Sequence, residues 1–297
     1  MQSQVQLIQI INKIDRLPEL PQVALKLTQL LDDPDVSAEK LADVIRVDAS
    51  FTSQVLKLCN SAAYGLSRTI STVKEAVAIL GFKVLKSMVY TIIAKITLDK
   101  PIDGYSLDKG ALWKNALTCA VYAKHIAKRE RFADPELAFT AALLRDLGKI
   151  VLGEFVGANY AQIEQKAMDE KIDFVQAEEK VLGISHTTVG AKIGEKWNLP
   201  AQLISVMKYH HKPVNLPPNL DAQLAKLILI VHLADSFTML IGSGIGNDGL
   251  MYTLDIDALG KAGFKTDEES LELLMSELME QNRIIKELEE SLKAFGN

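Results

Sequence analysis

Histidine and aspartate side chains in the second half of the chain have the residue types that could do chemistry. They are Asp146, His186, His210, His211, His232 and Asp235. Imidazole nitrogens and carboxylate oxygens suit divalent transition metals, and metal sites in helical proteins gather their ligands from several helices. The residue types therefore permit a metal site, provided that the fold brings these distant positions together.

The stretch Leu143–Lys149 leads into this set. Arg145 and Asp146 are the first charges after an apolar run that starts at Pro135, and Gly148 can turn the backbone just behind them. Charged residues are mostly exposed, so one interpretation is a solvated pair at a helix end. The other is a buried pair, which is costly unless both charges find partners elsewhere in the chain.

The elements that must position these residues are helices. Almost every periodic segment has helical spacing and β-hairpin signals are nearly absent, so we predict an all-α, multi-helical fold. The predicted helices cover 4–14, 72–81, 82–98, 107–130, 135–144, 158–170, 174–182, 187–197, 200–210, 221–241 and 267–295, with further helices that start at Pro21, Ser37 and Asp48.

The segment 100–104 (KPIDG) is the best candidate linker, because proline and glycine interrupt the helical pattern there. We therefore predict an N-terminal helical lobe over 1–100, a second helical lobe over 101–250, and a C-terminal segment with a helix over 251–297.

Composition and charge exclude several classes of protein. Of 297 residues, 48% are hydrophobic and 24% charged, and the net charge of −5 gives no basic face for nucleic acid. Cys59 and Cys119 lie in helical patterns and are expected to be buried, reduced thiols. The apolar run 227–240 is broken by His232 and Asp235, and the N-terminus lacks a signal-peptide pattern. We expect a soluble, cytoplasmic protein without a membrane partner.

The order of the polar residues resembles the ligand order of the HD superfamily of metal-dependent phosphohydrolases. In that family a histidine, a His-Asp pair, further histidines and a late aspartate bind one or two metals. The resemblance retains Asp146, Lys149, His186, His210, His211 and Asp235. It places Asn115 where the family has its first histidine and Arg145 where it has the histidine of the pair. In catalytic members the lysine can meet a substrate phosphate.

The first half of the chain is similar to the HDOD family, the HD-related output domain of bacterial signalling proteins. The resemblance runs from about Leu17 to Pro213 and continues more weakly toward the C-terminus. Its motifs are LPELP at 17–21, Asp48, NSAAYG at 60–65, ISTVKEA at 70–76 and LG at 80–81. It implies an HD-like fold, a degraded metal site and action through protein contacts.

Arg145 weighs most in predicting the chemistry. A guanidinium has no lone pair for a metal, stays protonated, and repels a divalent ion by several kcal/mol at close range with an effective dielectric constant of about 20. Asn115 is a poor ligand. We therefore expect no metal, no cofactor and no catalysis, and we predict that Arg145 instead pairs with the distant Asp235. If a metal binds nevertheless, its ligands would be Asp146, His186, His210, His211 and Asp235.

Each of these residues also has a plain structural interpretation. Asp146 could pair with any basic group, His186 could make a loop hydrogen bond before a helix, and His210 and His211 could lie on the surface at a helix end. Lys149 could be a solvated charge. The loop of Asn60, Tyr64 and Gly65 reads as a tight turn, with a partner-binding loop as the alternative.

We therefore predict a non-catalytic signal-transduction module whose partners are signalling proteins, with no nucleic acid and no membrane involved. One alternative is a metal-dependent phosphohydrolase or phosphodiesterase. Another is binding of a phosphate or nucleotide ligand without turnover, with Arg145 and Lys149 as the positive groups.

The last predicted helix carries apolar residues at spacings of three and four, interrupted by Gln281. They are Leu271, Leu274, Leu278, Ile285, Leu288 and Leu292. Such a seam permits a homodimer through a coiled coil, or docking of the helix on its own chain.

Overall fold

The computed structural model of the protein describes residues 2–16, 26–27, 29–30, 33, 35–249 and 252–293. Across these residues the chain is built from helices, and the only β-type pairing is an isolated antiparallel bridge between Ile102 and Leu107. The all-α prediction is confirmed. The helix predicted to start at Pro21 falls mostly outside the described residues.

The chain forms two compact units that are discontinuous in sequence. Unit 1 contains Met1–Leu17 and Leu98–Met279, and unit 2 contains Pro18–Thr97 and Glu280–Asn297. The junction near residue 98 lies close to the predicted linker. However, the first helix belongs to unit 1 and the last helix to unit 2. Each is thus separated from its neighbours in sequence, whereas the three predicted segments are continuous.

Helix α1 (Gln2–Asp15) belongs to unit 1 because its apolar face packs against α8, α9 and α10 of that unit. Ile10 and Ile14 are buried, and Lys196 Nζ donates a hydrogen bond of 2.9 Å to the Ile14 carbonyl. The amphipathic pattern of residues 4–14 predicts a helix, but it does not say which lobe covers the apolar face.

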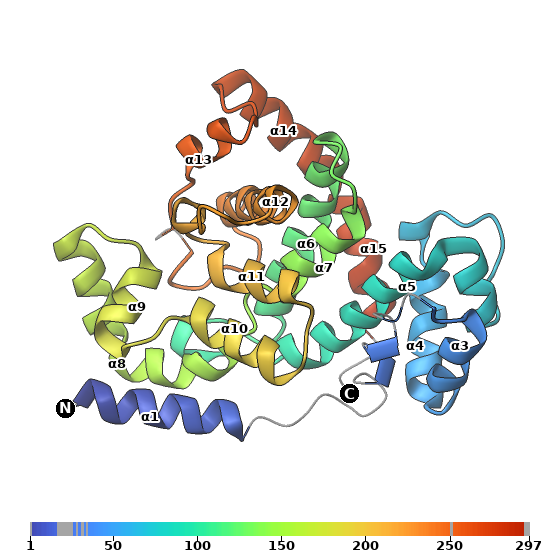
Figure 1. Ribbon diagram of the computed structural model, residues 1–297, viewed down its shortest axis with the longest axis horizontal. Helices are drawn as coiled ribbons and strands as arrows, with labels where there is room; N and C mark the ends of the chain where they lie inside the picture. Colours follow the sequence, from blue (N-terminus) through green and yellow to red (C-terminus); the bar gives the residue numbers. More distant parts are fainter. Residues whose placement is uncertain are drawn as a thin grey trace. The chain divides into compact units, whose positions relative to one another are not determined.

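Unit 1 contains the helices that carry the predicted site residues, together with further helices of the same unit (Figure 1). They are α6 (Ala111–Arg129), α7 (Pro135–Leu144), α8 (Lys149–Glu170), α9 (Phe174–Leu182), α10 (His186–Lys196), α11 (Ala201–Tyr209), α12 (Ala222–Leu240), α13 (Ile256–Lys261) and α14 (Glu268–Glu280). Helices α6, α7 and α12 pack on one another, and α10 packs on α11. Helix α8 begins at Lys149 rather than near 158, so the turn after α7 is only four residues long.

Unit 2 contains α3 (Ala38–Arg46), α4 (Ala49–Cys59), the short 3₁₀ helix η1 (Ala62–Tyr64), α5 (Val73–Leu98) and α15 (Asn282–Leu292). Ser37 and Asp48 cap α3 and α4 with their side chains, as predicted. Helix α5 breaks at Gly81, where φ is 82°, which agrees with the two helices predicted on either side of this residue.

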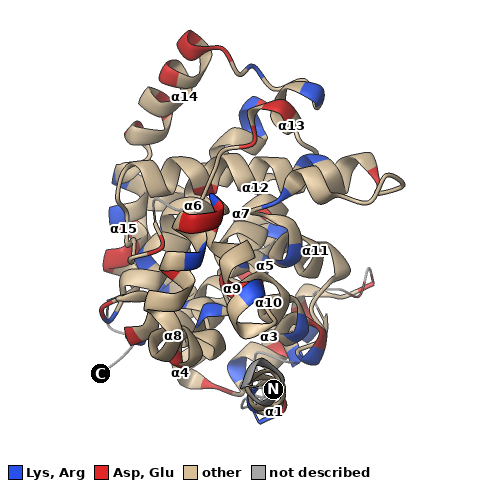
Figure 2. Cartoon of the chain, turned by 90° about the vertical axis from the view of Figure 1, so that its left-hand side faces the viewer, with Lys and Arg blue, Asp and Glu red and all other residues tan. Residues whose placement is uncertain are grey.

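The single helix predicted over 267–295 is wrong, because the chain forms α14 and α15 with a break at Gln281. Leu274 and Leu278 are buried on α14, whereas Ile285, Leu288 and Leu292 are buried on α15, which packs against α4 and η1 in unit 2. The apolar seam is thus covered within the chain, and a homodimer through it remains an untested prediction. Helix α14 carries acidic side chains and no basic ones (Figure 2).

Two helices, α5 and α12, are long and apolar enough to cross a membrane by length and composition, although 56% and 67% of their most apolar windows are buried. Both cysteines are free and buried, as predicted. The cytoplasmic location remains a prediction.

Candidate functional site

Helix α7 brings the first two polar residues of the site into the interior of unit 1. The Asp134 side chain caps its N-terminus, Pro135 occupies its first turn, and the whole stretch from Ala138 to Leu144 is buried. Such a helix places whatever follows it in the core. Arg145 is 0% exposed and Asp146 is 1% exposed. The interpretation as a solvated pair at a helix end is therefore wrong.

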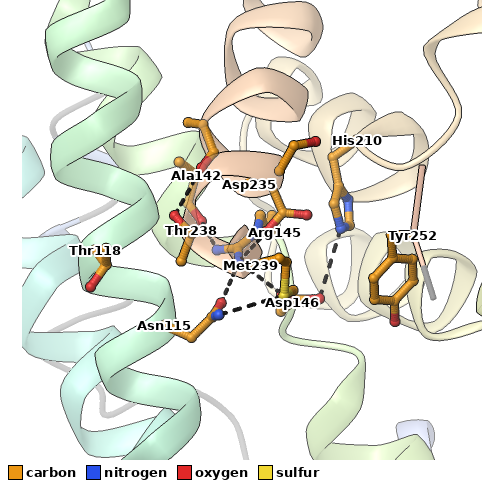
Figure 3. A network of polar contacts seen from close by, with 12 residues as sticks. Asn115, Thr118, Ala142, Arg145, Asp146, His210, Asp235, Thr238, Met239 and Tyr252 are labelled. Carbon is orange, nitrogen blue, oxygen red and sulfur yellow. Dashed lines mark hydrogen bonds and ion pairs between the residues drawn. The ribbon is translucent and has the colours of Figure 1, made fainter. Parts of the chain in front are cut away.

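Arg145 is held by a complete set of partners (Figure 3). Its Nε donates to Asp235 Oδ1 at 2.9 Å, and its Nη2 lies 2.5 Å from the same oxygen. Nη2 also donates to Asn115 Oδ1, and Nη1 donates to the Ala142 carbonyl at 3.0 Å. The predicted contact between Arg145 and Asp235 is confirmed. It consumes the late aspartate that a metal would otherwise use.

Asn115 is fixed on its other side as well. Its Nδ2 donates to the Ser243 carbonyl at 2.9 Å, and the Ser243 hydroxyl lies 2.8 Å from Thr118 Oγ1. The amide thus uses its oxygen for Arg145 and its nitrogen for the segment after α12, so it is fully engaged in binding protein groups.

Asp146 faces the histidines and the two basic side chains. Its Oδ2 lies 3.2 Å from Arg145 Nη2, and its Oδ1 lies 3.5 Å from Lys149 Nζ. The same Oδ1 is 3.5 Å from His186 Nε2 and 3.7 Å from His210 Nε2. Burial on its own raises the pKa of this carboxyl, but the charges of Lys149 and Arg145 outweigh it and hold the pKa well below its usual range.

Two contacts with protein oxygens orient the rings of His186 and His210. His186 Nδ1 lies 2.7 Å from Glu178 Oε2, and His210 Nδ1 lies 3.0 Å from the Met207 carbonyl. A carbonyl can only accept, so the Nδ1 of His210 donates this hydrogen bond. The Nε2 atoms of both rings face Asp146 Oδ1, at 3.5 Å from His186 and 3.7 Å from His210.

His211 is held between Asp235 and an aromatic ring. Its Nδ1 lies 3.5 Å from Asp235 Oδ2, and Tyr252 stacks on its ring at 3.9 Å with an interplanar angle of 4°. Burial lowers the pKa of His211 well below its usual value, and the neighbouring His210 and His186 lower it further. His211 is therefore neutral at physiological pH.

A short segment after α12 closes the site from the other side. Asp248 Oδ2 accepts a bond of 2.7 Å from the Tyr252 hydroxyl and lies 2.9 Å from Lys149 Nζ. Burial lowers the pKa of Lys149, but Asp146 and Asp248 outweigh it, so the net pKa is raised and the ammonium is retained. Lys149 is 2% exposed, so its interpretation as a solvated charge is wrong.

Two glycines allow these segments to lie so close together. A Cβ on Gly148 would be 1.8 Å from the His186 carbonyl oxygen, and a Cβ on Gly246 would be 1.9 Å from the Tyr105 carbonyl oxygen. Gly148 therefore lets the turn after α7 touch the start of α10. Gly246 lets the segment after α12 press against Tyr105.

His232 has a structural role instead. Its Nδ1 lies 2.7 Å from the His210 carbonyl, and its Nε2 accepts from the Asp255 amide at 2.9 Å. With one nitrogen donating and the other accepting, the neutral ring has no lone pair left for a metal. It fixes the backbone that carries His210.

The structure brings together all eight predicted site residues. Asn115, Arg145, Asp146, Lys149, His186, His210, His211 and Asp235 are all buried in unit 1. The surface interpretation of His210 and His211 is therefore wrong. The sequence did not reveal Glu178, Tyr105, Asp248 or Tyr252, since no motif marks them and only their positions in space place them beside His186, Lys149 and His211.

The predicted partner loop is a separate feature in unit 2. Asn60 Oδ1 accepts from the Ile70 amide at 2.7 Å, and Asn60 Nδ2 donates to the Ile70 carbonyl at 2.8 Å. Gly65 adopts a left-handed conformation with φ of 59° after η1. The interpretation of this loop as a tight turn is supported, because Asn60 at its start is bonded to the Ile70 backbone and Gly65 turns left-handed between them.

The remaining donor set fits a metal ion. Asp146, His186, His210 and His211 each offer one atom, and these four atoms lie within 4.8 Å of one another. The Nε2 atoms of all three histidines and both oxygens of Asp146 are buried without a hydrogen-bond partner. Buried polar atoms are rarely left unsatisfied, so this convergence is compatible with a bound cation. A divalent ion bound there would supply charge compensation and Lewis acidity.

The sequence profile of the HDOD domain matches residues 17–213. The chain belongs to the HDOD family. Over 217 residues it is 26% identical to a protein of Treponema pallidum (strain Nichols). The matched region covers 70% of this chain but only 39% of that relative's length.

Solved structures share the fold. An HDOD domain protein with unknown function from Geobacter sulfurreducens is 29% identical, with a TM-score of 0.73 and 97% of both chains covered. A provisionally named phosphohydrolase from Shewanella amazonensis SB2B is 23% identical, with a TM-score of 0.70, covering 95% of this chain and 97% of that one. A provisionally named signal transduction protein from Marinobacter aquaeolei VT8 is 22% identical, with a TM-score of 0.71, covering 98% of this chain and 66% of that one.

Proposed function

We propose that this HDOD protein acts in signal transduction through contacts with other proteins, and that it does not hydrolyse phosphoesters. The observation that carries the proposal is the buried bond network of Arg145. The guanidinium stands at the position where an HD hydrolase has a metal-binding histidine, and it engages both Asn115 and Asp235.

Hydrolysis by an HD-type site needs metal ligands and a position open to water or substrate. Here Asp235 is tied to Arg145, and Asn115 to Arg145 and Ser243. Asp146, His186 and His210 are at most 1% exposed. The site therefore lacks the full set of metal ligands that hydrolysis needs, and its burial leaves a phosphodiester no open approach.

Binding of a phosphate ligand is also disfavoured by the pairing of the basic groups. Arg145 is paired with Asp235, and Lys149 is paired with Asp248 at 2.9 Å. An incoming phosphate would have to displace a buried carboxylate from each cation. The names of the structural relatives include both a phosphohydrolase and a signal transduction protein. The pairing of Arg145 favours the signalling interpretation for this chain.

Unit 2 offers a surface for such contacts. An open groove of about 610 Å³ is lined by residues of α3 and α4, among them Arg46, Thr52, Leu56 and Lys57. Leu56 supplies apolar contact area for a partner segment.

Affinity capture from lysate of the source cells, with the full chain as bait, tests the proposal. We expect a specific protein to be retained by the wild type and by the control Lys83→Glu, an exposed lysine on α5 outside the groove. The double variant Leu56→Asp with Lys57→Glu should lose that protein while keeping its helical circular dichroism. If both variants retain the protein equally, the groove is not its binding surface. If the full chain retains no protein at all, the proposed function is contradicted.

A further inference from the structure

Helix α15 belongs to unit 2, but the chain reaches it only after passing through unit 1. The rest of unit 2 is Pro18–Thr97, whereas α15 lies in the later segment Glu280–Asn297. The HDOD profile ends at residue 213, so α15 also lies outside the matched domain. No peptide link joins α15 directly to the rest of unit 2, so packing alone holds it there.

A single apolar stripe attaches α15 to this unit. Ile285, Leu288 and Leu292 are buried, and their spacings of three and four place them on one face of the helix. Lys286 and Glu290 are exposed on the other side. An amphipathic helix that lays such a stripe on an apolar surface is a recurring mode of recognition between proteins. Helix α15 thus binds unit 2 in the way that a helix of a second protein would.

The surface beneath α15 includes the loop at residues 60–65, for which partner binding is the alternative interpretation. Helix α15 packs against α4 and against η1, the short helix of this loop (Figure 1). Two of the three residues of η1 are Ala62 and Ala63, whose short side chains let a helix approach the backbone closely. The loop that the sequence offers as a partner site is therefore covered by a helix of the same chain.

One acidic side chain makes the packing of α15 imperfect. Glu287 Oε2 is buried without a hydrogen-bond partner among the residues that the structure describes. Its other oxygen, Oε1, lies 3.7 Å from the Nε of Arg283, whose side chain is 83% exposed. A buried carboxylate oxygen without a donor loses its hydration and gains nothing in return, so it weakens the attachment of the helix. A helix with an apolar residue at this position would bind the same surface more tightly.

We propose that α15 is a strap over a helix-binding face of unit 2, formed by α4 and η1, and that a partner displaces it by placing its own amphipathic helix there. The partner helix carries apolar residues at the spacing of Ile285, Leu288 and Leu292, and an apolar residue in place of Glu287. This inference rests on the proposed function, because it assumes a protein partner. To the groove lined by α3 and α4 it adds a face that the chain itself keeps covered.

Binding of a fluorescein-labelled peptide of residues 280–293 to the full chain, followed by fluorescence anisotropy, tests the proposal. The double variant Leu288→Asp with Leu292→Asp should release α15. We expect it to bind the peptide about tenfold more tightly than the wild type, in which the strap competes for the face. The control Leu273→Asp changes an exposed residue of α14 and should bind the peptide like the wild type. A peptide that carries the same two aspartates should not bind.

Three outcomes would overturn the proposal. They are equal binding of the peptide to the double variant and to the wild type, binding to neither, and a loss of helical circular dichroism in the double variant larger than the eleven residues of α15 can supply. In the last case α15 would be part of the core of unit 2. None of these outcomes bears on affinity capture by the groove, so failure of the strap is distinguishable from failure of the proposed function.

Hydrogen exchange of the full chain supplies a second test that leaves the apolar stripe intact. In the wild type, the amides of α15 should exchange about tenfold faster than those of α4, because the strap opens without unfolding the rest of unit 2. Glu287→Leu removes the unpaired oxygen and should slow exchange across α15 severalfold, whereas Glu290→Leu, on the exposed side of the same helix, should leave it unchanged. A common exchange rate for α15 and α4, or equal rates in the two variants, would contradict the proposal.

Discussion

Replacing Arg145 by alanine tests the buried ion pair directly. The substitution removes the donors to Asp235, Asn115 and Ala142 and leaves the Asp235 carboxylate, 2% exposed, without its guanidinium. Breaking a buried pair by removing one partner typically costs about 3–5 kcal/mol. In a unit of 150–250 residues this corresponds to a melting temperature lower by roughly 6–20 °C.

Urea denaturation followed by tryptophan fluorescence reports the unfolding of unit 1, because both tryptophans, Trp113 and Trp197, lie in that unit. The matched control is Lys180→Ala, in the same unit. Lys180 also pairs with a carboxylate, that of Glu170, but its side chain is 50% exposed. Exposed pairs contribute about 0–1 kcal/mol. We therefore expect Lys180→Ala to behave nearly like the wild type.

A double-mutant cycle with Asp235→Asn refines the result. Once Arg145 is gone, neutralising Asp235 should recover part of the lost stability, since no carboxylate is then left unpaired. If Arg145→Ala stays within about 1 kcal/mol of Lys180→Ala, the reasoning that Arg145 is an internal counter-ion is refuted.

Three further changes have defined outcomes. Gly246→Ala should clearly lower the melting temperature of unit 1, because the added Cβ would lie 1.9 Å from the Tyr105 carbonyl oxygen. The control Gly260→Ala, whose Cβ would lie 3.7 Å from its nearest atom, should be neutral or mildly stabilising. Equal melting temperatures of the two variants would argue against the close approach at Gly246. Asn60→Ala should destabilise unit 2 by roughly 1–3 kcal/mol through the unpaired Ile70 backbone groups, seen as faster hydrogen exchange at residues 60–70, and unchanged exchange would contradict this. Burial lowers the pKa of His232 from its ordinary 6.5, so below pH 6.5 the unfolded chain binds a proton that the folded chain does not. The unfolding free energy of the metal-free protein should therefore fall as the pH drops from 6.5 to 5, by up to about 1.4 kcal/mol per pH unit. An unfolding free energy that does not change over this range would contradict the prediction.

Much of the fold could be predicted because helical periodicity and capping residues are local signals. Asp134 with Pro135 marks the start of α7, and Gly81 marks the break in α5. The surface that a helix packs against, however, is not determined by its local sequence. The seam of leucines after residue 270 has the same pattern whether it meets a second chain or its own, and the chain itself covers it on both sides of Gln281.

The site was predictable to the extent that its residues follow a family order. The contact between Arg145 and Asp235 could be inferred because both stand at positions that meet in HD proteins. Glu178, Asp248 and Tyr252 could not, because each is an ordinary residue in a helix or loop whose role arises from packing against His186, Lys149 and His211. The burial of Lys149 was missed for the same reason, since its partner Asp248 lies on a distant segment.

We propose that internal charge pairing has replaced hydrolysis at this site. The most direct test is hydrolysis of bis(p-nitrophenyl) phosphate by the full chain, loaded with Mn²⁺ or Zn²⁺, compared with Asp146→Ala purified in the same way. We predict release of nitrophenolate at the rate of the buffer alone for both proteins. Turnover by the wild type that disappears in Asp146→Ala would show that the site is catalytic and would contradict this proposal.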